Sequence, residues 1–197
     1  MVYIALTFNC YKVSIEPRTV VELFKLMMVF DKLELQNDNT RKCLVETREQ
    51  VSGAYKGIIV CRDIEEGMAL LKLVQNVVSE KISKKIQVTM RRGCSEYGLS
   101  YPEYAQIGQG VATMDYKEEW QEYEDLADKE LVIDTQPPVS DTYNHPTYTT
   151  RDVRVMLSWL VYAATIGDFS YLKIYNSVLK PLPDLKRPSP FQPIDVE

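Results

Sequence analysis

Residues 55–82 read YKGIIVCRDIEEGMALLKLVQNVVSEKI, a short apolar run followed by a longer amphipathic one. The run at residues 55–61 is bounded by turn signals, which is typical of a buried strand. Asp63 has the side chain of a helix N-cap, and Glu65 and Glu66 suit the positive first turn of a helix. The apolar residues that follow recur at helical spacing: Met68, Leu71, Val74, Val78 and Ile82. This stretch therefore predicts a strand followed directly by a helix.

The flanking sequence adds two more strands. Residues 42–48 predict a strand before the stretch, and Gln-Val-Ser-Gly at residues 50–53 predicts the turn between them. Because the connection is short, the two strands are expected to form an antiparallel hairpin. Residues 85–92 alternate between apolar and polar side chains and predict a further strand, with Ile86, Val88 and Met90 on its inner face.

The first residues follow the same logic. Residues 2–12 alternate with a period of two and predict a strand whose outer face carries Tyr3 and Tyr11. Ser14, Glu16 and Pro17 are residues that begin helices, and apolar residues recur at helical spacing from residue 20 to residue 30. The order of elements is then βαββαβ. We expect an α+β protein whose first part, about residues 1–95, is a ferredoxin-like antiparallel sheet with two helices on one face.

Charge and aromatic content divide the chain near residue 95. The 197 residues are 45% hydrophobic and 26% charged, which is typical of a globular protein. Residues 1–95 carry a net charge of +4 and three tyrosines, whereas residues 96–197 carry −9 and ten tyrosines. The second part is expected to be a Tyr-rich, acidic and largely helical extension that packs on the first part as one unit.

Within this extension, residues 115–131 predict an acidic helix with Tyr116, Trp120 and Tyr123 on one face. A long irregular stretch at residues 132–149 contains His145 between Asn and Pro. Thr149-x-x-Asp152 is a capping box that opens a helix at residues 153–166, which is apolar on nearly all sides and is expected to be buried.

Gly167-Asp168 ends that helix and begins a shorter one, so the two predict an antiparallel helical hairpin. Because Ile58 and Val60 make the sheet apolar on both faces, we expect residues 153–179 to cover the face opposite the first two helices, or else to lie in a subunit interface. The tail from residue 181 is rich in proline. It is expected either to lie along its own domain with Phe191 as anchor, or to present Arg187-x-x-Pro190-x-x-Pro193 as a ligand for the aromatic groove of another protein.

Several classes of protein are disfavoured. No apolar run is long enough to cross a bilayer, and residues 1–8 lack a basic n-region, so neither a membrane span nor a signal peptide is expected. The four cysteines are widely spaced, which favours a reduced, cytoplasmic protein. With one histidine and no paired cysteines, we expect no metal site.

Enzyme chemistry finds little support in the pattern. A two-metal site on such a sheet needs carboxylates on the first strand and the hairpin, and the hairpin offers only Glu46 and Glu49. No nucleophile and base stand at a recognisable spacing, and no cofactor motif is present. The residues therefore favour a non-enzymatic protein without cofactor.

Lys56-Gly57-Ile58-Ile59-Val60-Cys61 followed by Arg62-Asp63 resembles the signature of the RNA-recognition motif at the same place in the topology. Ile58 and Val60 occupy the positions where that family stacks bases on aromatic rings. The resemblance implies single-stranded nucleic-acid binding on the outer face of the sheet. The residues that would bind a nucleic acid or another anion are Tyr3, Tyr11, Lys56, Arg62, Arg91 and Arg92.

The leading hypothesis is a protein-binding or assembly module, because tyrosine and tryptophan are favoured interface anchors. Its partner is another protein or a second copy of the chain. The expected interface residues are Tyr116, Trp120, Tyr123, His145 and Phe191. Two alternatives stay open: a single-stranded nucleic-acid binder, and a protein that binds a small anion such as a nucleotide near Arg91-Arg92-Gly93.

Overall fold

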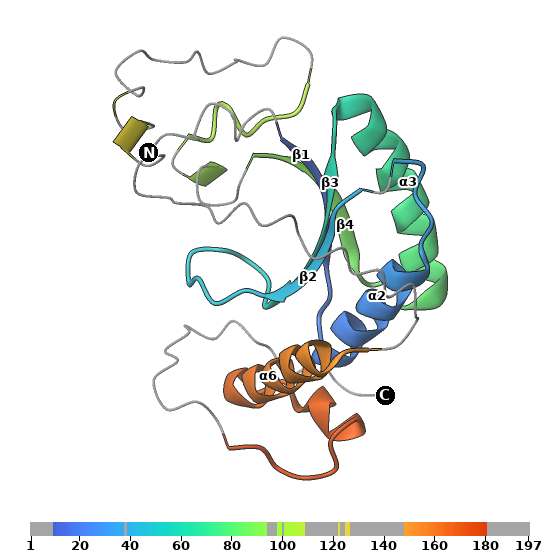
Figure 1. Ribbon diagram of the computed structural model, residues 1–197, viewed down its shortest axis with the longest axis vertical. Coiled ribbons are helices and arrows are strands. Elements are labelled where there is room, and N and C mark those ends of the chain that lie inside the picture. Colours follow the sequence, from blue (N-terminus) through green and yellow to red (C-terminus); the bar gives the residue numbers. More distant parts are fainter. Residues whose placement is uncertain are drawn as a thin grey trace. The chain divides into compact units, whose positions relative to one another are not determined.

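The computed structural model describes residues 10–37, 39–93, 98–99, 101–108, 122, 125–126 and 148–180 (Figure 1). The chain divides into two compact units. One contains Met1–Cys10 with Arg92–Thr147, and the other contains Tyr11–Arg91 with Tyr148–Glu197. The second, called here the sheet unit, holds almost all of the described helices and strands.

The protein is α+β, with a four-stranded antiparallel sheet and three α-helices among the described residues. The strands are β1 (Tyr11–Glu16), β2 (Arg41–Val45), β3 (Tyr55–Cys61) and β4 (Gln87–Arg92), and they lie side by side in the order β2-β3-β1-β4. The α-helices are α2 (Val20–Lys32), α3 (Ile64–Lys81) and α6 (Thr150–Ile166), and a short 3-10 helix, η2 (Phe169–Lys173), follows α6.

The register separates the two faces of the sheet. Val13 of β1 pairs with Ile59 of β3, and both point toward α2 and α3 into a core cluster. Their neighbours, which pair as Lys12 with Val60 and Ser14 with Ile58, point to the opposite face, because side chains alternate along a strand. We call this second face the far face.

Of the strand expected at residues 2–12, the described residues include only 10–12, and Tyr11 and Lys12 lie in a strand that continues beyond the expected end. β1 begins at Tyr11, and residues 1–9 lie outside the described part. Ser14 and Glu16, expected to begin a helix, are strand residues, and Thr19 caps α2 instead by accepting a hydrogen bond from the Glu22 amide. Residues 11–16 alternate too, and pairing with β3 outweighs the local preference of Ser and Glu for helix starts.

Helix α3 begins as its sequence predicts. The Asp63 carboxylate accepts a hydrogen bond from the Glu66 amide at 2.8 Å, and Val74 and Val78 lie in the core. Met68, expected in the apolar stripe, is 45% exposed, and Leu70 is buried on that face instead.

A close approach between α2 and the sheet depends on Gly57. A Cβ atom at this position would lie 2.4 Å from Leu26 Cδ2 and 3.2 Å from Phe30 Cζ, both on α2. Only a residue without a side chain allows α2 to pack this tightly on β3.

The capping signals of α6 are confirmed. Thr149 and Asp152 form the predicted capping box, and Gly167 ends the helix in the left-handed conformation at φ 80°. Asp168 then caps η2. No helix in the described ranges combines the length and apolarity that a bilayer crossing requires.

The packing of α6 differs from the prediction. The rings of Trp159 and of Phe24 on α2 pack in a T-shaped arrangement with 5.7 Å between centroids, and those of Tyr162 and Tyr55 do so at 6.0 Å. A second core cluster joins α2, β3, α6 and η2: Val20, Leu23, Phe24, Tyr55, Trp159, Leu160, Tyr162, Ala163 and Tyr171.

The expected cover of the far face by residues 153–179 is therefore wrong. Helix α6 buries its aromatic side against α2 and the start of β3, whereas the far-face residues Ile58 and Val60 belong to neither core cluster. Nor is α6 buried on all sides, since Val153 and Leu157 are 45% and 47% exposed. Helix α6 therefore buries one apolar side in the core of the protein and leaves apolar residues exposed elsewhere on its surface.

Candidate functional site

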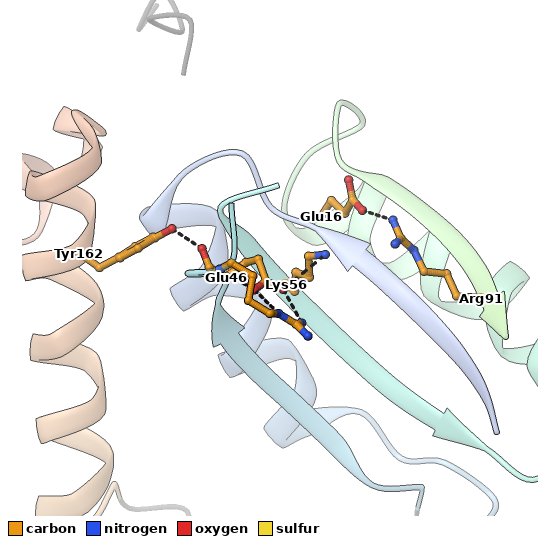
Figure 2. Close-up of polar contacts among 6 residues, drawn as sticks. Glu16, Glu46, Lys56, Arg91 and Tyr162 are labelled. Atoms are coloured by element: carbon orange, nitrogen blue, oxygen red, sulfur yellow. Dashed lines mark hydrogen bonds and ion pairs between the residues drawn. The ribbon is translucent and has the colours of Figure 1, made fainter. Parts of the chain in front are cut away.

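Five charged side chains gather on and beside the far face of the sheet: Glu16, Glu46, Arg48, Lys56 and Arg91 (Figure 2). We call them the charged cluster. They come from β1, the segment after β2, β3 and β4, so only the folded sheet brings them together.

Glu46 is held by Arg48 in a two-point contact. Arg48 Nε donates to Oε1 and Nη2 donates to Oε2, both at 2.8 Å, and only 3% of Glu46 is exposed. Burial would raise the pKa of Glu46, but the hydrogen bonds from Arg48 and the charges of Arg48 and Lys56 lower it below its usual value. Glu46 is therefore an ionised carboxylate whose two oxygens are both occupied.

Lys56 is the unusual member of the charged cluster. It is 2% exposed, and its Nζ lies 3.8 Å from Glu46 Oε2, beyond hydrogen-bond distance. Among the described residues, this Nζ has no hydrogen-bond partner. Burial, and after it the charge of Arg91, lower the pKa of Lys56.

Glu16 and Arg91 form the third contact of the charged cluster. Arg91 Nη2 lies 2.5 Å from Glu16 Oε1, and the two side chains are 36% and 17% exposed, respectively. The five groups therefore comprise three cations and two carboxylates, and each carboxylate is engaged by an arginine.

A second buried polar group secures α6 to the rest of the sheet unit. Asp168 Oδ2 accepts hydrogen bonds from the Val20 amide and from the Tyr55 hydroxyl, both at 2.6 Å, and Oδ1 accepts from the Ser170 amide at 3.0 Å. Every donor is part of the fold itself, so this carboxylate is a structural anchor.

The expected site residues are distributed unevenly. Tyr3, and the interface residues Tyr116, Trp120, Tyr123, His145 and Phe191, lie outside the described residues. Lys56 and Arg91 do share the far face. Arg62 follows the other end of β3 and is exposed, and Arg92 is buried at the end of β4.

The expected position of Tyr11 on the outer face is wrong. It pairs with Cys61 and packs against the core cluster beneath α2 and α3. On the far face, the described strand residues include no aromatic side chain on which a base would stack.

Glu16 and Arg48 were missed as site residues, and Glu46 was considered only as a metal ligand. The one signal in the sequence was Lys56, a charge inside an otherwise apolar strand. Its neighbours come from three other segments and have no common spacing along the chain.

The described residues offer little for metal or thiol chemistry. Within them, no group of three or more His, Cys, Asp and Glu side chains is placed to hold a metal ion. Burial, with a smaller contribution from Asp31, raises the pKa of Cys43 to about 12, so this thiol stays protonated and is a poor nucleophile.

Comparisons with protein-family models, with curated proteins and with solved structures find no match to the chain.

Proposed function

We propose that the protein is a non-enzymatic module that binds another protein through α6, η2 and the residues after η2. The observation that carries this proposal is a set of apolar side chains between 39% and 85% exposed on these segments. We call it the docking surface: Val153, Val155, Leu157, Phe169, Leu172, Ile174, Tyr175 and Val178. Apolar residues concentrated in this way mark binding sites more often than scattered exposed ones do.

The spacing on α6 suits a helix or groove of a partner. Val153 and Leu157 are one turn apart, and the partly buried Val161 continues the same side at the next turn. This side is distinct from the one that Trp159 and Ala163 bury against α2. Helix α6 thus has one apolar side for its own core and another for a partner.

The charges around the docking surface favour an acidic partner. Within residues 148–180, the exposed ionised side chains are Arg151, Arg154, Lys173 and Lys180. The two carboxylates in this range are already used, Asp152 in the capping box and Asp168 as the buried anchor. A second copy would oppose like charges, whereas a protein with an apolar centre and an acidic rim complements the surface.

For the architecture, we propose the ferredoxin-like arrangement. The element order β1-α2-β2-β3-α3-β4 and the strand order β2-β3-β1-β4 support it. An experimentally determined structure of the full chain tests it, and a different order of strands would contradict it.

The binding proposal is tested with Leu157→Glu on α6 and the control Leu73→Glu, which changes an apolar residue of α3 that is 41% exposed. Partners captured with the wild type are purified and their affinities measured by calorimetry. We expect an acidic protein whose binding is lost in Leu157→Glu, kept in Leu73→Glu and weakened by salt. Equal loss in both variants, or no loss in either, would contradict the proposal.

Two further measurements test whether a second copy of the chain or a nucleic acid binds instead of an acidic protein, and sedimentation velocity addresses the first. Self-association that Leu157→Glu removes would show that a second copy, not an acidic partner, covers the docking surface. Binding to oligonucleotides with no effect of Leu157→Glu would assign the function to nucleic acid instead.

A further inference from the structure

The geometry points to a second binding site, independent of the docking surface. We propose that Lys56 and Arg91 bind one small oxyanion, the carboxylate or phosphate group of a ligand, on the far face of the sheet.

The first support is the unsatisfied ammonium group. Lys56 is 2% exposed and carries three N–H donors, yet its Nζ has no hydrogen-bond partner among the described residues. Buried polar groups in native proteins are nearly always hydrogen-bonded, and an exception calls for a ligand or a function. An acceptor oxygen beside Nζ would supply the missing partner.

The second support is the way in which the carboxylates of the charged cluster are engaged. Arginine nitrogens lie 2.8 Å from Glu46 and 2.5 Å from Glu16, whereas Lys56 Nζ lies 3.8 Å from Glu46. Arg48 occupies both oxygens of Glu46, and Arg91 contacts Glu16, so neither carboxylate is free to approach Lys56 more closely. An anionic ligand would give Lys56 a counter-charge at hydrogen-bond distance.

The third support is access. Arg91 is 36% exposed at its side chain, so the charged cluster reaches solvent on the Glu16–Arg91 side. The Lys56 side chain lies between Glu46 and the Glu16–Arg91 pair (Figure 2). Arg91 contacts Glu16 through Nη2 alone, and its other N–H groups are suited to a second oxygen of the same ligand.

These features fit a single anionic group better than a nucleic-acid backbone. A backbone presents a row of phosphates and is bound by a row of exposed cations. Here one of the two proposed cations is buried, and the exposed Arg62 follows the other end of β3.

The test is a titration of the full chain with inorganic phosphate and, separately, with acetate, at constant ionic strength. The thermal midpoint is followed for the wild type, for Lys56→Met, and for Lys42→Met, which removes an exposed lysine of β2 whose side chain lies on the same face. We expect a saturable rise in the wild type and Lys42→Met, and none in Lys56→Met. A response to phosphate alone or to acetate alone identifies the class of oxyanion.

A second measurement does not depend on Lys56→Met folding. Calorimetric affinity for the anion that responds is compared between the wild type and Arg91→Gln, with at least about a tenfold loss expected for one charge-assisted hydrogen bond. No saturable response to either anion in the wild type would overturn the proposal. So would an equal response in Lys56→Met, which would mean general screening of charge.

Discussion

The hydroxyl of Tyr162 in α6 donates a hydrogen bond to the main-chain carbonyl of Glu46, a residue that precedes it by 116 positions. The Glu46 side chain, in turn, belongs to the charged cluster (Figure 2). Helix α6 therefore holds the backbone at one edge of the proposed anion site while its other side carries part of the docking surface. This contact connects the helix that carries part of the docking surface to the segment that carries part of the charged cluster.

Tyr162→Phe tests this contact. The substitution keeps the ring that packs on Tyr55 and leaves the Glu46 carbonyl without the hydroxyl donor. We expect the free energy of unfolding to fall by about 1–2 kcal/mol, measured in urea. Tyr175→Phe, at a 40% exposed position, is the control and should change it by less than about 0.5 kcal/mol. Similar values for the two variants would mean that the hydrogen bond contributes nothing.

Lys56→Met should stabilise the protein when no anion is bound. A buried charge without a hydrogen bond is replaced by an apolar side chain of similar length, while Glu46 keeps Arg48. The expected gain is about 1 kcal/mol or more in urea unfolding, and the exposed Lys42→Met should be neutral. A loss of stability in Lys56→Met would show that the 3.8 Å contact with Glu46 is favourable.

The same variant makes a prediction about pH. Because the pKa of Lys56 is lowered in the folded state, the unfolded chain binds more protons between that pKa and the ordinary value of 10.5. The stability of the wild type relative to Lys56→Met should therefore rise with pH through this alkaline window. A difference that stays constant with pH would contradict the lowered pKa.

Glu46→Gln should destabilise the protein at neutral pH, by about 2 kcal/mol, because the buried Lys56 and the partly exposed Arg48 lose the charge of Glu46. The folded-state pKa of Glu46 lies below 4.5, so its contribution is fully present above pH 4.5 and is lost as pH falls through the folded-state value. The gap between wild type and variant should narrow in that acid range. Glu49→Gln, at an exposed position, provides the control, and a pH-independent gap would argue against the ion pair.

Gly57→Ala should destabilise the protein by about 1–3 kcal/mol, because the added methyl group would overlap Leu26 at 2.4 Å and press on Phe30. The double variant Gly57→Ala/Leu26→Ala makes room for the new methyl group. If overlap is the cause, the second substitution should cost less in this background than it does alone. Strict additivity of the two effects would exclude this explanation.

Features that depend on a few neighbouring residues were predictable from the sequence. The Asp63 cap, the Thr149–Asp152 capping box and the helix end at Gly167 each depend on hydrogen bonds within one or two turns. The bounds of β3 were predictable for a similar reason, because the strand is a compact apolar run between turn signals.

Features that depend on distant pairing were not predictable. β1 lies at Tyr11–Glu16 because it pairs with β3, more than 40 positions away, and the local signals of Ser14 and Glu16 favoured a helix start. The charged cluster escaped prediction in the same way, since Glu16, Lys56 and Arg91 meet only through that pairing and the strand order. For α6, composition predicts an apolar helix but not which side meets α2.

The carboxylate of Asp168 also affects the order in which parts of the chain can fold during synthesis. It accepts hydrogen bonds from the first residue of α2, 148 positions earlier, and from Tyr55, 113 positions earlier. When β1 to β4 have left the ribosome, the residues of α6 and η2 that complete the second core cluster are still missing. We therefore expect the second core cluster to form late in synthesis, after η2 has emerged, with the aromatic side chains of Phe24 and Tyr55 accessible to chaperones until then.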